Sequence, residues 1–334
     1  MERQSNFELL RIIAMFLVLA VHANYFALDG GPSAQECATR VIPSMTRIVL
    51  ESACIVCVDV FVLISGWFGI HFKWKSLLSF LFQVFFFGLL IYAFCVIFLD
   101  VPLNIKGIAA CFQITTWNWF VKSYLLLYLM SPILNAFCDQ SDKKAFLLVL
   151  ISFFSFQTIY GLTGSARFIE QGYSTISFIG LYLLAQYIRK FATFFSEKSI
   201  QFHCMGYFLC VTMLSILEFI SRLTNHPTRQ IFSYINPIVI LASVFLLLFF
   251  SKLRFTNRLV NWIASSCFAV FLLHTNVNLC EPVFCKKIVA LYNLNDGIVC
   301  LFLICCFLCV CYLLAILIDR FRKVIWLLLT KYFN

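Results

Sequence analysis

Long runs of apolar residues, separated by short polar segments, make up most of the chain. Three of these runs, residues 77–99, 231–251 and 297–318, contain no Asp, Glu, Lys or Arg. Each is close to the roughly 20 residues that an α-helix needs to cross a bilayer, and this length distinguishes the runs from buried strands. The pattern predicts an all-α protein, a polytopic integral membrane bundle.

About ten transmembrane helices are predicted, joined by short connections with no linker and no internal repeat. We therefore expect a single domain over residues 1–334. Within it, the basic start and Trp326 of residues 319–334 predict a cytoplasmic amphipathic tail that lies at the membrane interface. The predicted spans are residues 7–28, 46–69, 77–99, 118–137, 144–162, 173–191, 203–222, 232–251, 260–280 and 297–318.

The basic residues of the loops predict the orientation of the bundle. With the N-terminus in the cytoplasm, the inside segments carry about twice as many Lys and Arg residues as the outside segments, which is the usual bias. An even number of spans then places both termini in the cytoplasm. Glu8 and Arg11 lie where the apolar core of a cleaved signal peptide would begin, which favours a retained first span.

Composition agrees with this class and narrows the chemistry. Hydrophobic residues make up 62% of the chain and charged residues 12%, whereas soluble domains have about 25% charged residues. Most of the 16 cysteines lie in apolar runs, where a thiol behaves as a small hydrophobic group, so no metal is expected. The net charge of +10 is scattered over short loops, so no nucleic acid partner is expected.

An arginine and a histidine interrupt the first apolar run. Arg11 and His22 are eleven residues apart, which places them within about 20° of each other around a helix and about 16 Å apart along its axis. Glu8 lies on the same face and can pair with Arg11. Ionisable groups this deep in a span normally mark function, although Arg11 could simply extend to the interface while His22 bonds a neighbouring helix.

Four segments resemble one known family. The stretch FELLRIIAMFLVLAVHA (7–23) is similar to the first helix of the bacterial membrane acyltransferases of family 3, whose signature is Arg-x10-His. VDVFVLISGWF (58–68), WFVKSYLLLYLMSPILN (119–135) and LVNWIASSCFAVFLLHTN (259–276) resemble later segments of that family in the same order. Each motif is weak alone, but four in register cover most of the chain.

The resemblance implies an O-acyltransferase of the bacterial cytoplasmic (inner) membrane. Its donor would be acetyl-CoA, and its acceptor a carbohydrate hydroxyl in a surface glycan or a lipid-linked sugar. The lipid bilayer and glycan-synthesis proteins are the other partners to expect, and the oligomeric state is not specified. One departure concerns HFKWKS (71–76), where many members have arginines: Lys73 and Lys75 can attract phosphate but lack the bidentate fork of arginine.

Chemical reasoning assigns roles to the first helix. A hydroxyl that attacks a thioester must lose its proton, and the neutral imidazole of His22 suits the task of general base. Arg11 could bind the donor's phosphates or fix Glu8. In this interpretation His22 and Arg11 are catalytic, and Arg11, Lys73 and Lys75 bind the cofactor.

Other polar residues within spans have weaker assignments. Asp59 is mid-span and is predicted to be catalytic, or to pair with Arg47 or Lys122. Ser65 could bind the acyl oxygen of the donor, or bond back to its own helix. Lys122, Tyr124 and His274 lie at predicted outer ends of spans and are candidates for acceptor binding, with interface anchoring or a structural histidine as alternatives.

Two other classes of protein compete with an acyltransferase. A transporter or flippase for a lipid-linked oligosaccharide often has internal repeats and broken helices, and the low content of 12 Gly counts against it. A membrane scaffold for glycan synthesis would have no need for a buried imidazole. No Gly-rich phosphate loop, H-E-x-x-H helix or G-x-S-x-G elbow is present in the sequence.

Overall fold

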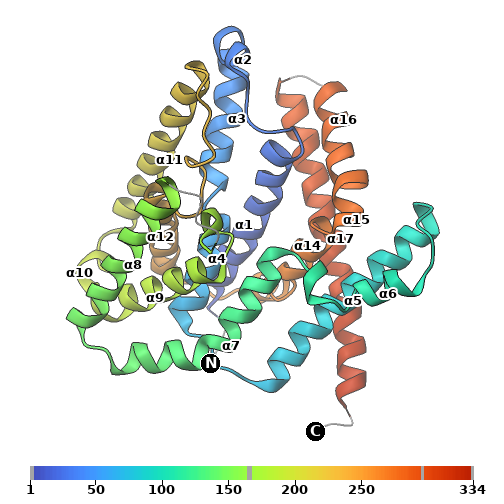
Figure 1. Ribbon diagram of the computed structural model, residues 1–334, viewed down its shortest axis with the longest axis horizontal. Coiled ribbons are helices and arrows are strands. Elements are labelled where there is room, and N and C mark those ends of the chain that lie inside the picture. Colours follow the sequence, from blue (N-terminus) through green and yellow to red (C-terminus); the bar gives the residue numbers. More distant parts are fainter. Residues whose placement is uncertain (1–3, 164–167, 295–296, 332–334) are drawn as a thin grey trace. The chain divides into compact units, whose positions relative to one another are not determined.

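The computed structural model describes residues 4–163, 168–294 and 297–331, and all regular secondary structure within them is helical (Figure 1). This confirms the predicted all-α class. Contacts divide the chain into two compact units, each assembled from separate segments. Unit 1 comprises Met1–Val18, Gly31–Phe72 and Trp119–Thr256, and unit 2 comprises Leu19–Gly30, Lys73–Asn118 and Asn257–Asn334.

The centre of unit 1 is the span Val41–Phe68, which consists of α3 (Val41–Cys54) and α4 (Cys57–Phe68). Most of this span is buried by other helices. Helix α4 packs against α9 (Thr175–Phe191) and α12 (Pro237–Lys252), so it contacts protein rather than lipid along much of its length (Figure 1).

The remaining helices of unit 1 surround this centre. Helix α11 packs against α12, α3 and the short α2, and α9 is flanked by α7, α8 and α10. Asn236 caps α12 by accepting a hydrogen bond from the Ile238 amide, and Pro237 occupies the first turn, so this pair starts the helix. The bounds are Ala34–Thr39 for α2, Trp119–Gln140 for α7, Lys143–Thr163 for α8, Thr193–Ser196 for α10 and Ile200–Leu223 for α11.

Two glycines explain the Ser-Gly-aromatic segment at the end of α4. A Cβ atom on Gly66 would lie only 2.5 Å from the Tyr182 carbonyl oxygen, so glycine lets α4 approach α9 closely. Gly69 ends the helix with φ +76°, a conformation that glycine adopts without steric cost. This segment therefore has a packing role in addition to any chemistry at Ser65.

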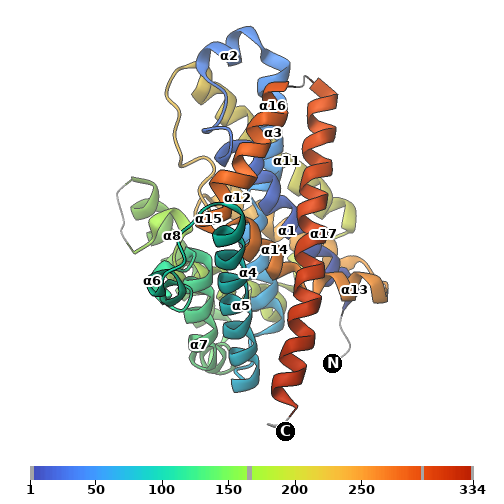
Figure 2. The same ribbon diagram turned by 90° about the vertical axis from the view of Figure 1, so that its right-hand side faces the viewer.

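Unit 2 is built around α17 (Gly297–Thr330), which packs against α14 (Cys267–His274), α16 (Lys286–Leu294) and α5 (Trp74–Phe98) (Figures 1 and 2). Most of α5 and α17 is not covered by protein, as expected for helices that face lipid. The shorter elements of unit 2 are η1 (His22–Phe26), α6 (Ile105–Ala110), η2 (Ile114–Thr116), α13 (Arg258–Ala264), α15 (Val277–Leu279) and η4 (Cys280–Cys285).

A helix occupies each of the ten predicted positions, but fewer qualify as complete spans. Within the described residues, seven helices are long and apolar enough to cross a membrane, or eight if the bent pair Arg258–His274 and Val277–Leu294 is one span. Helices α9 and α12, with 17 and 16 residues, are shorter than the 18 residues taken as the minimum for such a span. Both are packed among other helices, where protein rather than lipid can satisfy the backbone at their ends.

The prediction of a separate C-terminal interfacial helix is wrong. Helix α17 continues without a break from the predicted span to Thr330, a length of 34 residues. Asp319 pairs with Arg322 at 2.7 Å and with Lys323 at 3.3 Å within the same helix, and Gln83 donates a hydrogen bond to it. These charges partner one another, so they do not end the helix as they would if each had to reach water.

Candidate functional site

His22 lies where the first helix changes its winding. Helix α1 (Ser5–Val21) is regular, and a π-helical turn, η1, begins at His22, whose carbonyl oxygen accepts a hydrogen bond from the Ala27 amide at 2.9 Å. Such wider turns are rare, and they occur frequently at functional sites. The predicted continuity between Arg11 and His22 is confirmed, because one helix, Ser5–Phe26, carries both residues.

His274 lies at a second interruption of helical structure. It is the last residue of α14, and the chain then bends by 63° before the following helical segment. Thr275 hydrogen-bonds back to the Phe271 carbonyl, and Asn276 caps the next segment by accepting a hydrogen bond from the Asn278 amide. The break therefore uses ordinary capping chemistry and leaves His274 at a helix end.

The two histidines are in direct contact, although 252 residues separate them. His22 Nδ1 lies 2.9 Å from His274 Nε2, and His274 Nδ1 lies 2.6 Å from the Val270 carbonyl oxygen. A carbonyl can only accept, so His274 Nδ1 carries the proton. In the neutral form of both rings, His274 Nε2 then accepts from His22 Nδ1, and the lone pair of His22 is left on Nε2.

The rings differ in their access to the surroundings. His274 is only 4% exposed and packs near Phe271 and Phe284, whereas His22 is partly exposed and lies near Phe26. The His274 ring has a hydrogen-bond partner at both nitrogens, and the His22 ring has one at Nδ1. This arrangement is suited to presenting a single, oriented nitrogen of His22 to a reactant.

A basic cluster holds the opposite end of α14. The Lys323 ammonium donates to the Ser265 carbonyl at 2.7 Å and to the Ser265 and Ser266 hydroxyls at 2.9 and 3.0 Å. Arg320 donates to the Ser265 hydroxyl at 3.0 Å and stacks on Trp262, which precedes the break between α13 and α14. The eight-residue helix that ends in His274 is thus fixed at its start by α17.

Arg11 forms the predicted ion pair within unit 1. Its Nη1 atom donates to Glu8 Oε1 at 2.7 Å, and the Arg11 side chain is about one-third exposed while Glu8 is buried. One guanidinium nitrogen therefore neutralises the buried carboxylate. A second ion pair within one helix, Glu218–Arg222, is also formed in unit 1, at 2.8 Å and a spacing of four residues.

Asp59 is enclosed in α4 of unit 1. Its side chain is fully buried, and neither carboxylate oxygen has a hydrogen-bond partner among the described residues. The alternative that Asp59 bonds Arg47 or Lys122 is therefore not seen in this part of the chain. A buried acid without a partner is costly, so its presence requires an explanation.

Ser65 and Tyr124 meet in unit 1. Their hydroxyl oxygens are 3.2 Å apart, and Ser65 also donates to the Phe61 carbonyl of its own helix at 3.0 Å. Lys122, on the same helix as Tyr124, is exposed. Ser65 thus forms the hydrogen bond to its own helix that was one of the two interpretations of the sequence. Its contact with Tyr124 was not predicted.

Lys73 and Lys75 are both exposed at the start of α5 in unit 2. The preceding turn is held in unit 1, where Tyr182 accepts a hydrogen bond from the Ile70 amide at 2.9 Å and Asn135 donates to the Ile70 carbonyl at 2.8 Å. Sequence reasoning missed this clamp, for which the only signal was two polar side chains on apolar helices. Among the described residues, no group of three His, Cys, Asp or Glu is placed to hold a metal ion.

Comparison with known proteins identifies the family. The sequence model of the acyltransferase family 3 domain, described as "Acyltransferase domain", matches residues 4–320 and thus nearly the whole chain. Comparisons with curated proteins and with solved structures found no match. Together with the candidate membrane spans, the family match establishes the class that the four sequence segments suggested. The chain is a multi-pass membrane enzyme that belongs to acyltransferase family 3.

Proposed function

We propose that this acyltransferase transfers an acetyl group from acetyl-CoA to a hydroxyl of a sugar, with His22 as the general base. The acceptor is a cell-surface polysaccharide or its lipid-linked precursor, and the protein works in the bacterial cytoplasmic membrane. The single observation that carries the proposal is the contact of His22 Nδ1 with His274 Nε2 at 2.9 Å. It leaves His22 Nε2 as the basic nitrogen of a held, partly exposed ring.

The reaction needs little beyond an oriented base. A thioester is already activated, so the difficult step is to deprotonate the hydroxyl as it attacks. The acceptor oxygen bonds to the thioester carbonyl carbon while His22 Nε2 takes the hydroxyl proton. The carbon–sulfur bond then breaks, and the imidazolium returns the proton to the departing thiolate. The products are a sugar ester and a free thiol.

His274 acts on this base as a positioning residue. Its Nδ1 proton is directed at the Val270 carbonyl, so its Nε2 atom can only accept from His22 in the neutral form. The same ring can stabilise the charge on His22 after proton transfer because it retains an acceptor nitrogen. Binding of the acceptor sugar by His274 remains a prediction. Loss of such a contact would raise the KM for the sugar, whereas loss of the positioning role would lower kcat.

The remaining predicted residues divide between donor and acceptor. Arg11, Lys73 and Lys75 are proposed to attract the donor's phosphates, and Ser65 to bind its acyl oxygen. Lys122 and Tyr124 are proposed to contact the acceptor sugar. Asp59 is proposed to assist catalysis, because a buried acid without a hydrogen-bond partner destabilises the fold and is therefore more typical of a functional residue than of a packing residue.

The test is labelled acetyl transfer by the purified full chain in proteoliposomes. His22→Ala should lower the transfer rate by roughly 10²–10⁴-fold, the usual contribution of a general base. His226→Gln, at an exposed histidine in the loop before α12, should leave the rate unchanged. Transfer by His22→Ala at the wild-type rate contradicts the proposal. Movement of intact glycan across the vesicle without acyl transfer would instead identify a flippase.

The acceptor can be identified independently. Cell-surface glycan from matched cells with and without this protein should differ in acetyl ester content, measured by NMR. An unchanged glycan, together with active transfer to a small sugar in vitro, would contradict the polysaccharide acceptor while leaving the role of His22 intact.

A further inference from the structure

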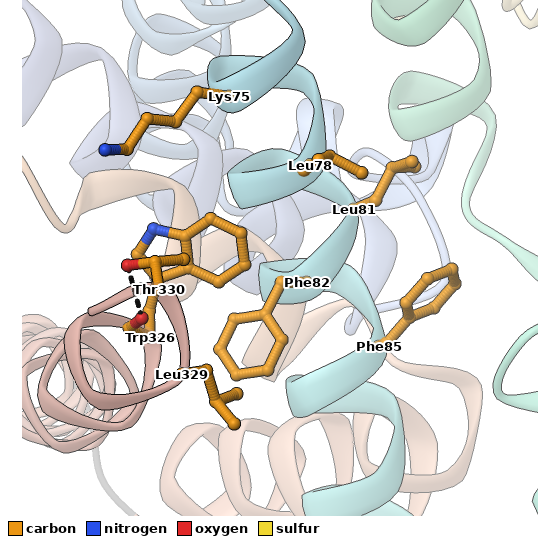
Figure 3. A pocket seen from close by; sticks show the side chains of 8 residues that line it. All are labelled: Lys75, Leu78, Leu81, Phe82, Phe85, Trp326, Leu329 and Thr330. Carbon is orange, nitrogen blue, oxygen red and sulfur yellow. Dashed lines mark hydrogen bonds between the residues drawn. The ribbon is translucent and has the colours of Figure 1, made fainter. Parts of the chain in front are cut away.

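A groove of about 530 Å³ lies in unit 2 between the first three turns of α5 and the last turn of α17 (Figure 3). In Figure 3 the Lys75 side chain lies at one end of the groove, and the rings of Phe82 and Trp326 face each other between the two helices. The groove is lined by Lys75, Leu78, Leu81, Phe82, Phe85, Trp326, Leu329 and Thr330.

The lining is suited to hydrocarbon. Six of its eight side chains are large and apolar, and the Phe82 and Trp326 ring centroids are 5.1 Å apart. The Thr330 hydroxyl donates to the Trp326 carbonyl of its own helix at 2.8 Å, so its hydrogen is already used (Figure 3). Apart from Lys75, the groove offers little to a polar ligand.

Both helices that form the groove have the length and composition of membrane spans. The end of α17 exposes Leu327, Leu328 and Leu329. The loop charges predict that this end lies at the cytoplasmic side, and Trp326 is typical of the membrane–water interface. A groove of this kind borders the acyl chains of the inner leaflet.

Charge at the same end selects the head group. Lys73 precedes Lys75 by two residues on the way into α5, and Lys331 directly follows Thr330. No Asp or Glu occurs in residues 73–85 or 324–331. Basic residues between membrane helices on the cytoplasmic side attract anionic head groups, each contributing about 1 kcal/mol near the surface.

We propose that this groove binds one acyl chain of an anionic phospholipid of the inner leaflet, with the lipid phosphate at the Lys75 ammonium. The occupant fits the lining because its tail is hydrocarbon and its charge complements the lysines. The site is separate in chemistry from the His22–His274 pair and does not depend on acetyl-CoA as donor. One ammonium cannot hold the lipid phosphate and the donor's phosphates at once, so this proposal replaces the donor contact proposed above for Lys75 and leaves Arg11 and Lys73 in that role.

The experiment measures bound lipid on the purified full chain. The protein is reconstituted in nanodiscs of mixed phosphatidylglycerol and phosphatidylcholine, released gently, and analysed by native mass spectrometry. We expect retained phosphatidylglycerol in the wild type, about fivefold less in Lys75→Gln, as the loss of one lysine near the surface predicts, and almost none in Leu329→Trp, which fills the groove. Lys143→Gln, at an exposed lysine of unit 1, and Leu328→Trp, at an exposed leucine beside Leu329 but outside the lining, should match the wild type.

Each alternative outcome overturns the proposal. Equal retention of phosphatidylcholine would contradict the anionic head group, and unchanged retention in both Lys75→Gln and Leu329→Trp would contradict the site. Selective displacement of phosphatidylglycerol by a polyprenyl phosphate would assign the groove to a lipid-linked acceptor instead. His22→Ala protein, expected to be inactive, should retain the phospholipid at the wild-type level, which separates this test from that of the proposed function.

Discussion

Unit 1 and unit 2 each enclose ionisable groups among apolar helices, and they accommodate them in different ways. In unit 2, His22 and His274 hydrogen-bond each other, and the pair lies where a π-helical turn and a helix break interrupt regular winding. In unit 1, Asp59 lies in the first turn of α4, just after the break between α3 and α4, fully buried, with no hydrogen-bond partner among the described residues.

Both regions lie next to a break in helical winding, so they differ in whether a second polar side chain meets the first. A regular helix satisfies its backbone internally and directs each side chain according to a fixed period. At a helix end or a wider turn, side chains from distant segments can converge, as those of residues 22 and 274 do. We therefore expect the proton transfer of the proposed reaction to depend most on unit 2, and the polar residues of unit 1 to have smaller effects. The following predictions test that order.

The largest effect in this comparison is expected at His274. Replacement by Leu removes the acceptor for His22 Nδ1, so the ring loses its fixed tautomer and transfer should fall about 10²-fold, mainly in kcat. Replacement by Gln supplies an amide oxygen as an acceptor and should retain part of the rate. A pure acceptor-binding role would instead raise the KM for the sugar in both variants and leave kcat unchanged.

A smaller effect is expected at Asp59. Asp59→Asn keeps the shape of the side chain and removes the acid, and it should lower transfer about tenfold, equivalent to about 1.4 kcal/mol in the barrier. Protein yield should be unchanged, because the amide is cheaper to bury than a carboxylate. The control is Asp139→Asn at the exposed end of α7. Wild-type activity in Asp59→Asn would contradict a catalytic role for Asp59 and would show that the reaction does not need this acid of unit 1.

The smallest effects are expected at the proposed acceptor contacts. Lys122→Gln and Tyr124→Phe should each raise the KM for the acceptor about two- to fivefold, with little change in kcat, since each removes one polar contact. Lys144→Gln, at an exposed lysine on α8, serves as the control in the same kinetic assay. Unchanged KM values would contradict acceptor binding at this end of α7.

Sequence reasoning predicted the helices well because their signal is local. Uncharged runs such as 297–318 specify a span by length alone, and the ion pairs Glu8–Arg11 and Glu218–Arg222 follow from helical spacing. The predicted end of the last helix is wrong, because Asp319 and Arg322 form an ion pair within α17 and the helix continues past them. The consecutive residues Thr275 and Asn276 are of types that often cap helices, so they could have indicated the helix break after His274.

Only part of the candidate site could be proposed from the sequence. His22 and Arg11 are candidates because of their spacing within one helix, which needs no tertiary information, and their roles remain predictions. The contact between His22 and His274 joins segments 252 residues apart, and no periodicity encodes it. The π-helical turn at His22 likewise has no signal in a pattern based on 3.6 residues per turn. Tertiary packing therefore supplied the tautomer argument that the sequence could not.

The central claim is that His274 holds His22 with its Nε2 atom unprotonated and available as a base. Solid-state ¹⁵N NMR of histidine-labelled protein in lipid at neutral pH tests it directly, with the His22 signals assigned by comparison with His22→Gln. We expect a proton on Nδ1 of both rings and none on Nε2 of His22. A proton on His22 Nε2 would contradict the account, because that nitrogen could not then accept one from a hydroxyl.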